Sequence, residues 1–161
     1  MDVFDLILEA VENSVEAGAG QIKVAVDAED GGCRVCVEDD GSARIPDDPF
    51  SPGCTVKGRG RGYGLSRIHD ISEGRCSLGR EGGRTLLRFS LGGLWQRCGL
   101  SDQLLPLFLF PADISLTINR SGKSFTLSTG ELRERDAFPD RAGAIGRFRK
   151  MVRLKEGEIY G

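Results

Sequence analysis

Apolar residues change their spacing at Gly18, and this change constrains the fold more than any other feature of the chain. Before it, apolar side chains recur at helical spacing from Asp2 to Ala17, at Val3, Phe4, Ile7, Val11 and Val15. After it, apolar and polar residues alternate over 21–27 and again over 33–38, with a glycine-containing turn between them. The first pattern predicts a helix with Asp2 as N-cap and Gly18 as its end, and the second predicts a β-hairpin.

The rest of the chain repeats this order after a long interruption. Residues 39–63 show little periodicity and much Gly, Pro, Asp and Arg, which predicts a functional loop. A short helix is expected over 65–72, strands over 75–78 and 84–91, and a domain boundary at Gly92-Gly93. Beyond it we expect a helix over 101–110 interrupted by Pro106, a second strand pair over 113–119 and 123–129, and one or two closing helices.

This order of elements predicts an α+β fold: a two-layer sandwich with a mixed sheet covered on one face by helices. Residues 1–93 are expected to form the main domain. Residues 94–161 are expected to form a small C-terminal α/β appendage, a hairpin and helix of unknown role.

Charge and hydropathy narrow the classes of partner. The 161 residues carry a formal charge of −2, so the chain lacks the general basic field that nucleic-acid binding uses, although Lys and Arg cluster at 57–61 and 147–155. An acidic amphipathic segment follows Met1, and the most apolar stretch, 104–110, is far shorter than the ~20 residues needed to cross a bilayer. We expect a cytoplasmic protein without nucleic-acid or membrane partners.

The five cysteines, at 33, 36, 54, 76 and 98, are odd in number and scattered, which favours reduced thiols. Cys33 and Cys36 form a C-x-x-C pair within a predicted strand. Their side chains should therefore point to opposite faces of the sheet, which favours packed thiols over zinc binding or redox chemistry.

Glu9 and Asn13 lie four residues apart on the first predicted helix, so they project from the same edge of it. A carboxylate and an amide oxygen placed in this way can share one ligand. Taken alone, the pair is better explained as a solvated polar helix face, so a functional interpretation depends on the rest of the chain.

Acids end the second predicted strand, in the segment Glu38-Asp39-Asp40-Gly41-Ser42. An acid at a strand end can accept a hydrogen bond from an exocyclic amine, and Gly41 lets a ring approach the backbone. The alternative is an acidic turn with no ligand.

Alternating glycines precede the next predicted helix, from Gly58 to Leu65. Successive backbone N–H groups followed by a helix N-terminus form an anion site, for which phosphate is the obvious ligand. The run lacks the Gly-Lys-Ser/Thr ending of the P-loop, and it does not directly follow a strand as the dinucleotide fingerprint does. Flexible Gly-Arg tails that bind RNA are a further alternative, but they are not followed by a helix and two strands.

In this order and spacing, the segments resemble the ATP-binding domain shared by gyrase, histidine kinases and MutL (the GHKL superfamily). The segment 8–19 resembles the family's asparagine box, which implies that Asn13 ligates Mg²⁺ and that Glu9 activates water. The segment 37–41 resembles the first glycine box, which implies that Asp39 binds the adenine amino group. Asp48-Pro49-Phe50 resembles an element that precedes the lid in histidine kinases.

The segment 60–65 resembles the second glycine box, and Thr85 matches a threonine that supports the adenine-binding Asp through water. Lys57 and Arg59 would supply the charges of the lid. The resemblance therefore implies ATP and Mg²⁺ as cofactors, Glu9 as catalytic residue and Asn13 as metal ligand. The cofactor-binding residues that it implies are Asn13, Asp39, Gly41, Lys57, Arg59, Gly60, Gly62, Gly64, Leu65 and Thr85.

The chain also departs from the family pattern. Ala43 stands where a second glycine is usual in the first glycine box, and Arg44 lengthens that turn by one residue. Tyr63 replaces the usual Leu, and the lid over 52–57 is short. These departures put the adenine contact and closure of the lid over the γ-phosphate in question.

Residues 94–161 resemble the tail of stand-alone superfamily members of anaerobic bacteria, which are often encoded beside iron-only hydrogenase subunits. This resemblance implies a link to hydrogenase assembly or regulation. The expected function is Mg-ATP binding, with slow hydrolysis or phosphoryl transfer to a protein partner. The alternatives are a nucleotide-responsive protein-binding module of the anti-sigma kind without significant turnover, and a degenerate domain that has lost nucleotide binding; homodimer formation is left open. His69 is expected to be structural or exposed.

Overall fold

A computed structural model describes residues 2–53, 63–93, 100–135 and 141–160 of the chain. The elements in chain order are α1 (Val3–Glu16), β1 (Gln21–Glu29), β2 (Gly32–Asp39), α2 (Gly64–Ile71), β3 (Cys76–Glu81), β4 (Arg84–Gly92), α3 (Leu100–Leu104), the 3₁₀ helix η1 (Leu105–Leu109), β5 (Asp113–Arg120), β6 (Lys123–Ser128), α4 (Thr129–Arg135) and α5 (Arg141–Tyr160).

The first helix begins and ends where the sequence predicts. The Asp2 carboxylate accepts hydrogen bonds from the backbone N–H of Phe4 at 2.8 Å and of Asp5 at 3.2 Å, and the Asp5 carboxylate accepts from the Asp2 N–H at 2.9 Å. This reciprocal capping pairs N–H groups that a helix start otherwise leaves without partners. Gly18, with φ of +85°, turns the chain away after the last turn.

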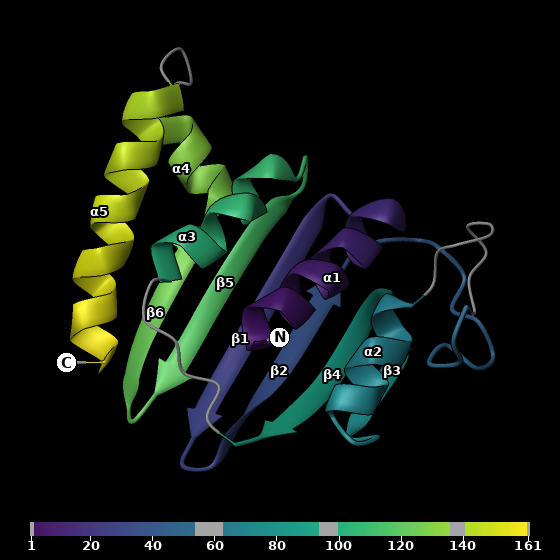
Figure 1. Cartoon of the computed structure of the whole chain (residues 1–161). Helices are drawn as coiled ribbons and strands as arrows, with labels where there is room; N and C mark the ends of the chain where they lie inside the picture. Colours follow the sequence, from purple (N-terminus) through teal and green to yellow (C-terminus); the bar gives the residue numbers. More distant parts are fainter. Residues whose placement is uncertain (1, 54–62, 94–99, 136–140, 161) are drawn as a thin grey trace.

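The strands form one mixed sheet in the order β3-β4-β2-β1-β5-β6 (Figure 1). Neighbouring strands pair antiparallel except for β1 and β5, which run parallel from Gln21↔Asp113 to Ala28↔Arg120. The hairpin β5–β6 therefore extends the sheet beside β1, with residues 113–128 in the same layer as the first four strands. The predicted mixed sheet is confirmed.

Helices cover one face of this sheet (Figure 1). The strand residues that point toward them are buried, and they alternate with more exposed residues on the opposite face. The buried apolar strand residues of the core cluster are Ile22, Val24, Val26, Cys33, Val35, Val37, Leu87, Phe89, Ile114, Leu116, Ile118, Phe125 and Leu127. The predicted two-layer α+β sandwich is thus confirmed, and one hydrophobic cluster runs through strands from both halves of the chain.

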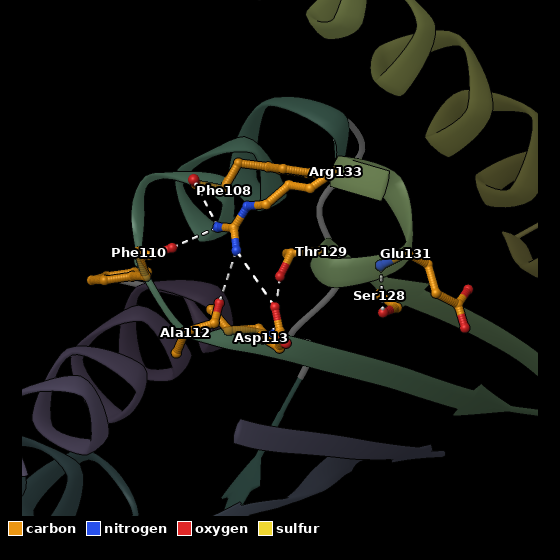
Figure 2. Close-up of polar contacts among 9 residues, drawn as sticks. Phe108, Phe110, Ala112, Asp113, Ser128, Thr129, Glu131 and Arg133 are labelled. Carbon is orange, nitrogen blue, oxygen red and sulfur yellow. Dashed lines mark hydrogen bonds and ion pairs between the residues drawn. The ribbon is translucent and has the colours of Figure 1, made fainter. Parts of the chain in front are cut away.

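Arg133 ties the C-terminal elements together. Its guanidinium donates to the backbone carbonyls of Phe108 at 3.1 Å, Phe110 at 2.5 Å and Ala112 at 3.2 Å, and it lies 3.7 Å from the Asp113 carboxylate (Figure 2). These carbonyls come from η1 and the segment leading into β5, so a single side chain on α4 fixes the path of that segment. Such charge-assisted hydrogen bonds are the stronger ones.

Cys33 and Cys36 point to opposite faces of β2, as the strand pattern predicts. Cys33 is buried on the helix-covered face, and this burial raises the pKa of its thiol to about 11. The described residues contain no group of three or more His, Cys, Asp and Glu side chains arranged for a metal ion. In the described part of the chain, no helix is both long enough and apolar enough to cross a membrane.

Candidate functional site

Asp39 is a buried carboxylate at the end of β2, with a relative exposure of 5%. Its Oδ2 accepts a hydrogen bond from the Ser14 hydroxyl at 2.6 Å, and its Oδ1 accepts one from the Gly41 N–H at 2.8 Å. A buried carboxylate requires such donors because water cannot reach it freely. The predicted base-binding acid is therefore held by groups from α1 and from the loop after β2.

Ser14 was not predicted as a site residue. It lies three residues after Val11 and seven after Ile7, so it falls on the buried stripe of α1, where the side chain is 5% exposed. A lone hydroxyl on an apolar stripe requires a buried partner. That signal was present in the sequence and could have pointed to Ser14.

Gly41 lies where the loop after β2 packs against the end of α1. A Cβ added there would come within 2.9 Å of the Asp39 Oδ1 and within 3.1 Å of both the Cβ and the carbonyl oxygen of Ala17. The next N–H, that of Ser42, donates to the same carbonyl at 3.2 Å. Only glycine fits at this position without displacing backbone.

A row of three residues crosses the sheet at this end of the site. Asp39 pairs with Thr85 on β4, and Thr85 pairs with Arg80 on β3, so the three side chains point to the same face. The Arg80 guanidinium donates to the carbonyl of Gly41 at 3.3 Å and of Ala43 at 2.6 Å. Arg80 therefore stabilises the turn in which Ala43 stands in place of the usual glycine.

The second end of the site is formed by α1 and α2. A Cβ added at Gly64 would lie 3.3 Å from the Asn13 Nδ2 and 3.6 Å from the Glu9 Oε2. The start of α2 therefore packs directly on the edge of α1 that carries Glu9 and Asn13. Three predicted site residues from two distant segments are brought together here.

Glu9 has one paired and one unpaired oxygen. Its Oε1 forms an ion pair with Arg67 of α2, and its Oε2 is buried without a hydrogen-bond partner among the described residues. Burial raises the pKa of Glu9, and the nearby Arg67 guanidinium partly opposes this shift. Arg67 was not predicted, since no helical or strand spacing relates it to Glu9.

Of the remaining predicted site residues, the structure describes only some. Leu65 packs against the hydrophobic core, and Lys57, Arg59, Gly60 and Gly62 lie outside the described residues. His69 is half exposed, with its ring 5.8 Å from that of Phe50. This contact gives His69 a packing role, in keeping with the expectation that it is structural or exposed.

The sequence of residues 1–92 matches the model of one protein family, described as histidine kinase-, DNA gyrase B- and HSP90-like ATPase. The match covers more than half of the chain. The chain therefore belongs to this family, and the resemblance found in its motifs is confirmed: residues 1–92 are a GHKL-type ATP-binding domain.

Solved structures with a similar fold come from several proteins. The catalytic domain of histidine kinase ThkA is 24% identical, with a TM-score of 0.44, and the match covers 55% of this chain and 64% of that chain. The N-terminal domain of a DNA repair protein is 17% identical, with a TM-score of 0.48, over 79% of this chain and 52% of that one.

The MutL ATPase domain of Aquifex aeolicus, solved with ADP, is 16% identical, with a TM-score of 0.43, over 82% of this chain and 65% of that one. The chain thus spans less than two thirds of the length of each of these structures. No curated protein is similar enough to count as a match.

Proposed function

We propose that this domain binds Mg-ATP along α1, with adenine at the Asp39 end and the phosphates at the Asn13 end, and that it hydrolyses ATP slowly or passes the γ-phosphoryl group to a protein. The observation that carries the proposal is that one helix supplies both ends. Asn13 faces the start of α2 while its neighbour Ser14 bonds to Asp39. A single elongated ligand with a hydrogen-bond-donating amino group at one end and an anionic tail at the other fits this arrangement.

At the adenine end, Asp39 would accept a hydrogen bond from the exocyclic amine. The Ser14 hydroxyl and the Gly41 N–H each occupy one of its oxygens, and each oxygen keeps a further lone pair for the ligand. An acceptor fixed in this way favours adenine, whose 6-position carries a donor, over guanine, whose 6-position carries an acceptor. Thr85 lies beside Asp39 in the sheet and would support the same contact.

At the phosphate end, Asn13 would hold Mg²⁺. The residues fit this ion: the Asn13 amide oxygen is a hard donor, the buried, unpaired Glu9 Oε2 can accept a hydrogen bond from a water nearby, and Mg²⁺ sites of this kind take few protein ligands and several from phosphate or water. The ion would supply charge neutralisation of the phosphates. The backbone N–H groups of residues 60–64 would bind phosphate oxygens, and Lys57 and Arg59 would add positive charge.

A nucleotide-responsive binding module without turnover is the second candidate. The observation that favours it is the ion pair between Glu9 and Arg67, since a carboxylate engaged by a guanidinium is a weaker base. In this case ATP would order the site for a protein partner. That partner would be a second copy of this chain or a protein of hydrogenase assembly.

Calorimetry with Mg-ATP and Mg-ADP up to millimolar concentration tests binding, and γ-labelled ATP tests the reaction. The proposal expects saturable binding, with label appearing slowly as free phosphate or on an added protein. Saturable binding with no released or transferred label would favour the second candidate. Flat titrations with both nucleotides would overturn both.

A further inference from the structure

Arg67 forms the one ion pair that joins α1 to α2 among the described residues. It lies on the exposed side of α2, between the buried residues Ser66 and Ile68, and its own side chain is 46% exposed. The core therefore does not require it. Its guanidinium nevertheless reaches the Glu9 carboxylate, which is only 22% exposed and lies beside the packed position of Gly64.

We infer that Arg67 is a positioning residue that restrains Glu9, holding its carboxylate toward α2 and thereby keeping ATP turnover slow. The inference rests on the proposed function, because it assigns Glu9 the role of base in that site. It assigns Arg67 an effect on rate rather than on nucleotide affinity.

The reaction shows what the restraint would slow. A water oxygen forms a bond to the γ-phosphorus, the bond from that phosphorus to the β–γ bridging oxygen breaks, and ADP leaves with the bonding electron pair. Glu9 takes a proton from the attacking water, so that phosphate and ADP are released without an additional reactant. A carboxylate must turn a free lone pair to the water to do this, but Arg67 occupies Oε1 and Oε2 is buried.

Among the charged groups around Glu9 in the described residues, Arg67 is the one that attracts its carboxylate. The other charged neighbours that act on Glu9 are the carboxylates of Asp5 and Glu12, on the same helix. No second cation among the described residues pairs with Glu9. Removing the guanidinium therefore frees Oε1 rather than exchanging one ion pair for another.

The test compares Arg67→Met, Arg67→Lys, Glu9→Gln and the double variant Arg67→Met/Glu9→Gln with the unchanged protein. Arg34→Met is the matched control, because Arg34 forms an exposed ion pair with Glu29 at the far end of the β1–β2 hairpin. Each protein is measured for kcat with Mg-ATP, for the Kd of Mg-ATP by calorimetry, and for its melting temperature without nucleotide.

We expect Arg67→Met to raise kcat by roughly tenfold, a part of the range that general-base catalysis spans, and to leave Kd within about twofold. Arg67→Lys should keep the slow rate because it keeps a cation at this position. The double variant should lose the acceleration, since the effect acts through Glu9. Without nucleotide, the melting temperatures of the single and double variants should be non-additive, with shifts of at most about 4 °C.

An unchanged or lower kcat in Arg67→Met would overturn the inference. So would a Kd weakened by more than about fivefold, because Arg67 would then contact the nucleotide itself, and so would additive melting shifts. Binding of ATP without turnover in any variant would overturn the restraint while leaving nucleotide binding intact. Absence of ATP binding by the unchanged protein would instead remove the proposed function, and the restraint with it.

Discussion

The two ends of the candidate site differ in how completely their polar atoms are paired. At the end proposed to bind adenine, Asp39 is 5% exposed and each of its oxygens accepts a hydrogen bond within the protein. At the phosphate end, Glu9 has one oxygen in an ion pair and the other buried without a partner in the described part of the chain. The first end is already organised for its ligand, whereas the second has a polar atom that a ligand or water would satisfy.

The largest effect should come from changing the acceptor at the organised end. Asp39→Asn replaces one carboxylate oxygen by an amide N–H₂ donor, which would face either the Ser14 hydroxyl or the Gly41 N–H and could not accept from the adenine amine. We expect ATP affinity to fall by about 1.5–3 kcal/mol, or roughly ten- to a hundredfold, in calorimetric titrations. Asp40→Asn, at the exposed neighbour that binds the Gly20 and Gln21 N–H groups, is the control. Undiminished ATP affinity in Asp39→Asn would contradict the assignment of the base site.

A methyl group at Gly41 should disturb the same end through packing. Its Cβ would lie within 3.1 Å of the Ala17 carbonyl, so the loop or the end of α1 must shift. We expect Gly41→Ala to lower the free energy of unfolding by about 1–3 kcal/mol and to weaken ATP binding, as measured by denaturant unfolding and calorimetry. Gly79→Ala on β3, where an added Cβ meets no atom within 4 Å, is the control. Equal effects of the two substitutions would argue against a tight fit at Gly41.

Removing the Ser14 hydroxyl should have a smaller effect. Ser14→Ala leaves the Asp39 Oδ2 without its buried donor, which we expect to cost about 1–2 kcal/mol of unfolding free energy. ATP affinity should fall several-fold because the carboxylate is less firmly oriented. Ser77→Ala, at an exposed position of β3, is the matched control. A stability equal to that of the control would show that water replaces the hydroxyl.

The smallest effect is expected at the unpaired end and depends on pH. Burial raises the pKa of Glu9 above 4.5, so the folded protein binds more protons at this group than the unfolded chain just above that pH. Stability contributed by this group therefore falls as pH rises through the folded pKa. Glu9→Gln, which cannot ionise, should gain melting temperature relative to the unchanged protein between pH 4 and pH 7.

Glu158→Gln, at an exposed position of α5, controls for the loss of one charge in that experiment. If Glu9→Gln instead lost stability relative to the unchanged protein as the pH rose, the Arg67 ion pair would outweigh the effect of burial. The contrast between the two ends would then be smaller than their hydrogen bonding indicates.

Local patterns in the sequence predicted most of the elements. The capping carboxylate of Asp2, the helical spacing in α1 and the alternation in β1 and β2 depend on neighbouring residues only, so periodicity and turn residues were sufficient. Asp39 was predicted as a candidate site residue only through the resemblance to the GHKL family, because acids followed by glycine at a strand end also form a turn without a ligand. Gly64 was found through the glycine run before α2.

Contacts between distant segments could not be predicted in this way. The parallel pairing of β1 with β5 joins strands that β2, β3 and β4 separate in sequence, and the pattern of neither strand specifies its neighbour. Arg80 reaches the Gly41 loop through the register of three strands, and Arg67 reaches Glu9 through the packing of two helices. Their side chains appear in the sequence as ordinary surface arginines.

The position of β5 beside β1 also determines how the sheet can open. Amides in the middle of β1 lie between two neighbours, so their exchange with water requires the loss of pairing contributed by both halves of the chain. Without the β5–β6 hairpin, β1 would become an edge strand with free N–H and C=O groups, ready to add a strand from another molecule. The C-terminal hairpin thus covers the edge of β1 that would otherwise be open to such pairing.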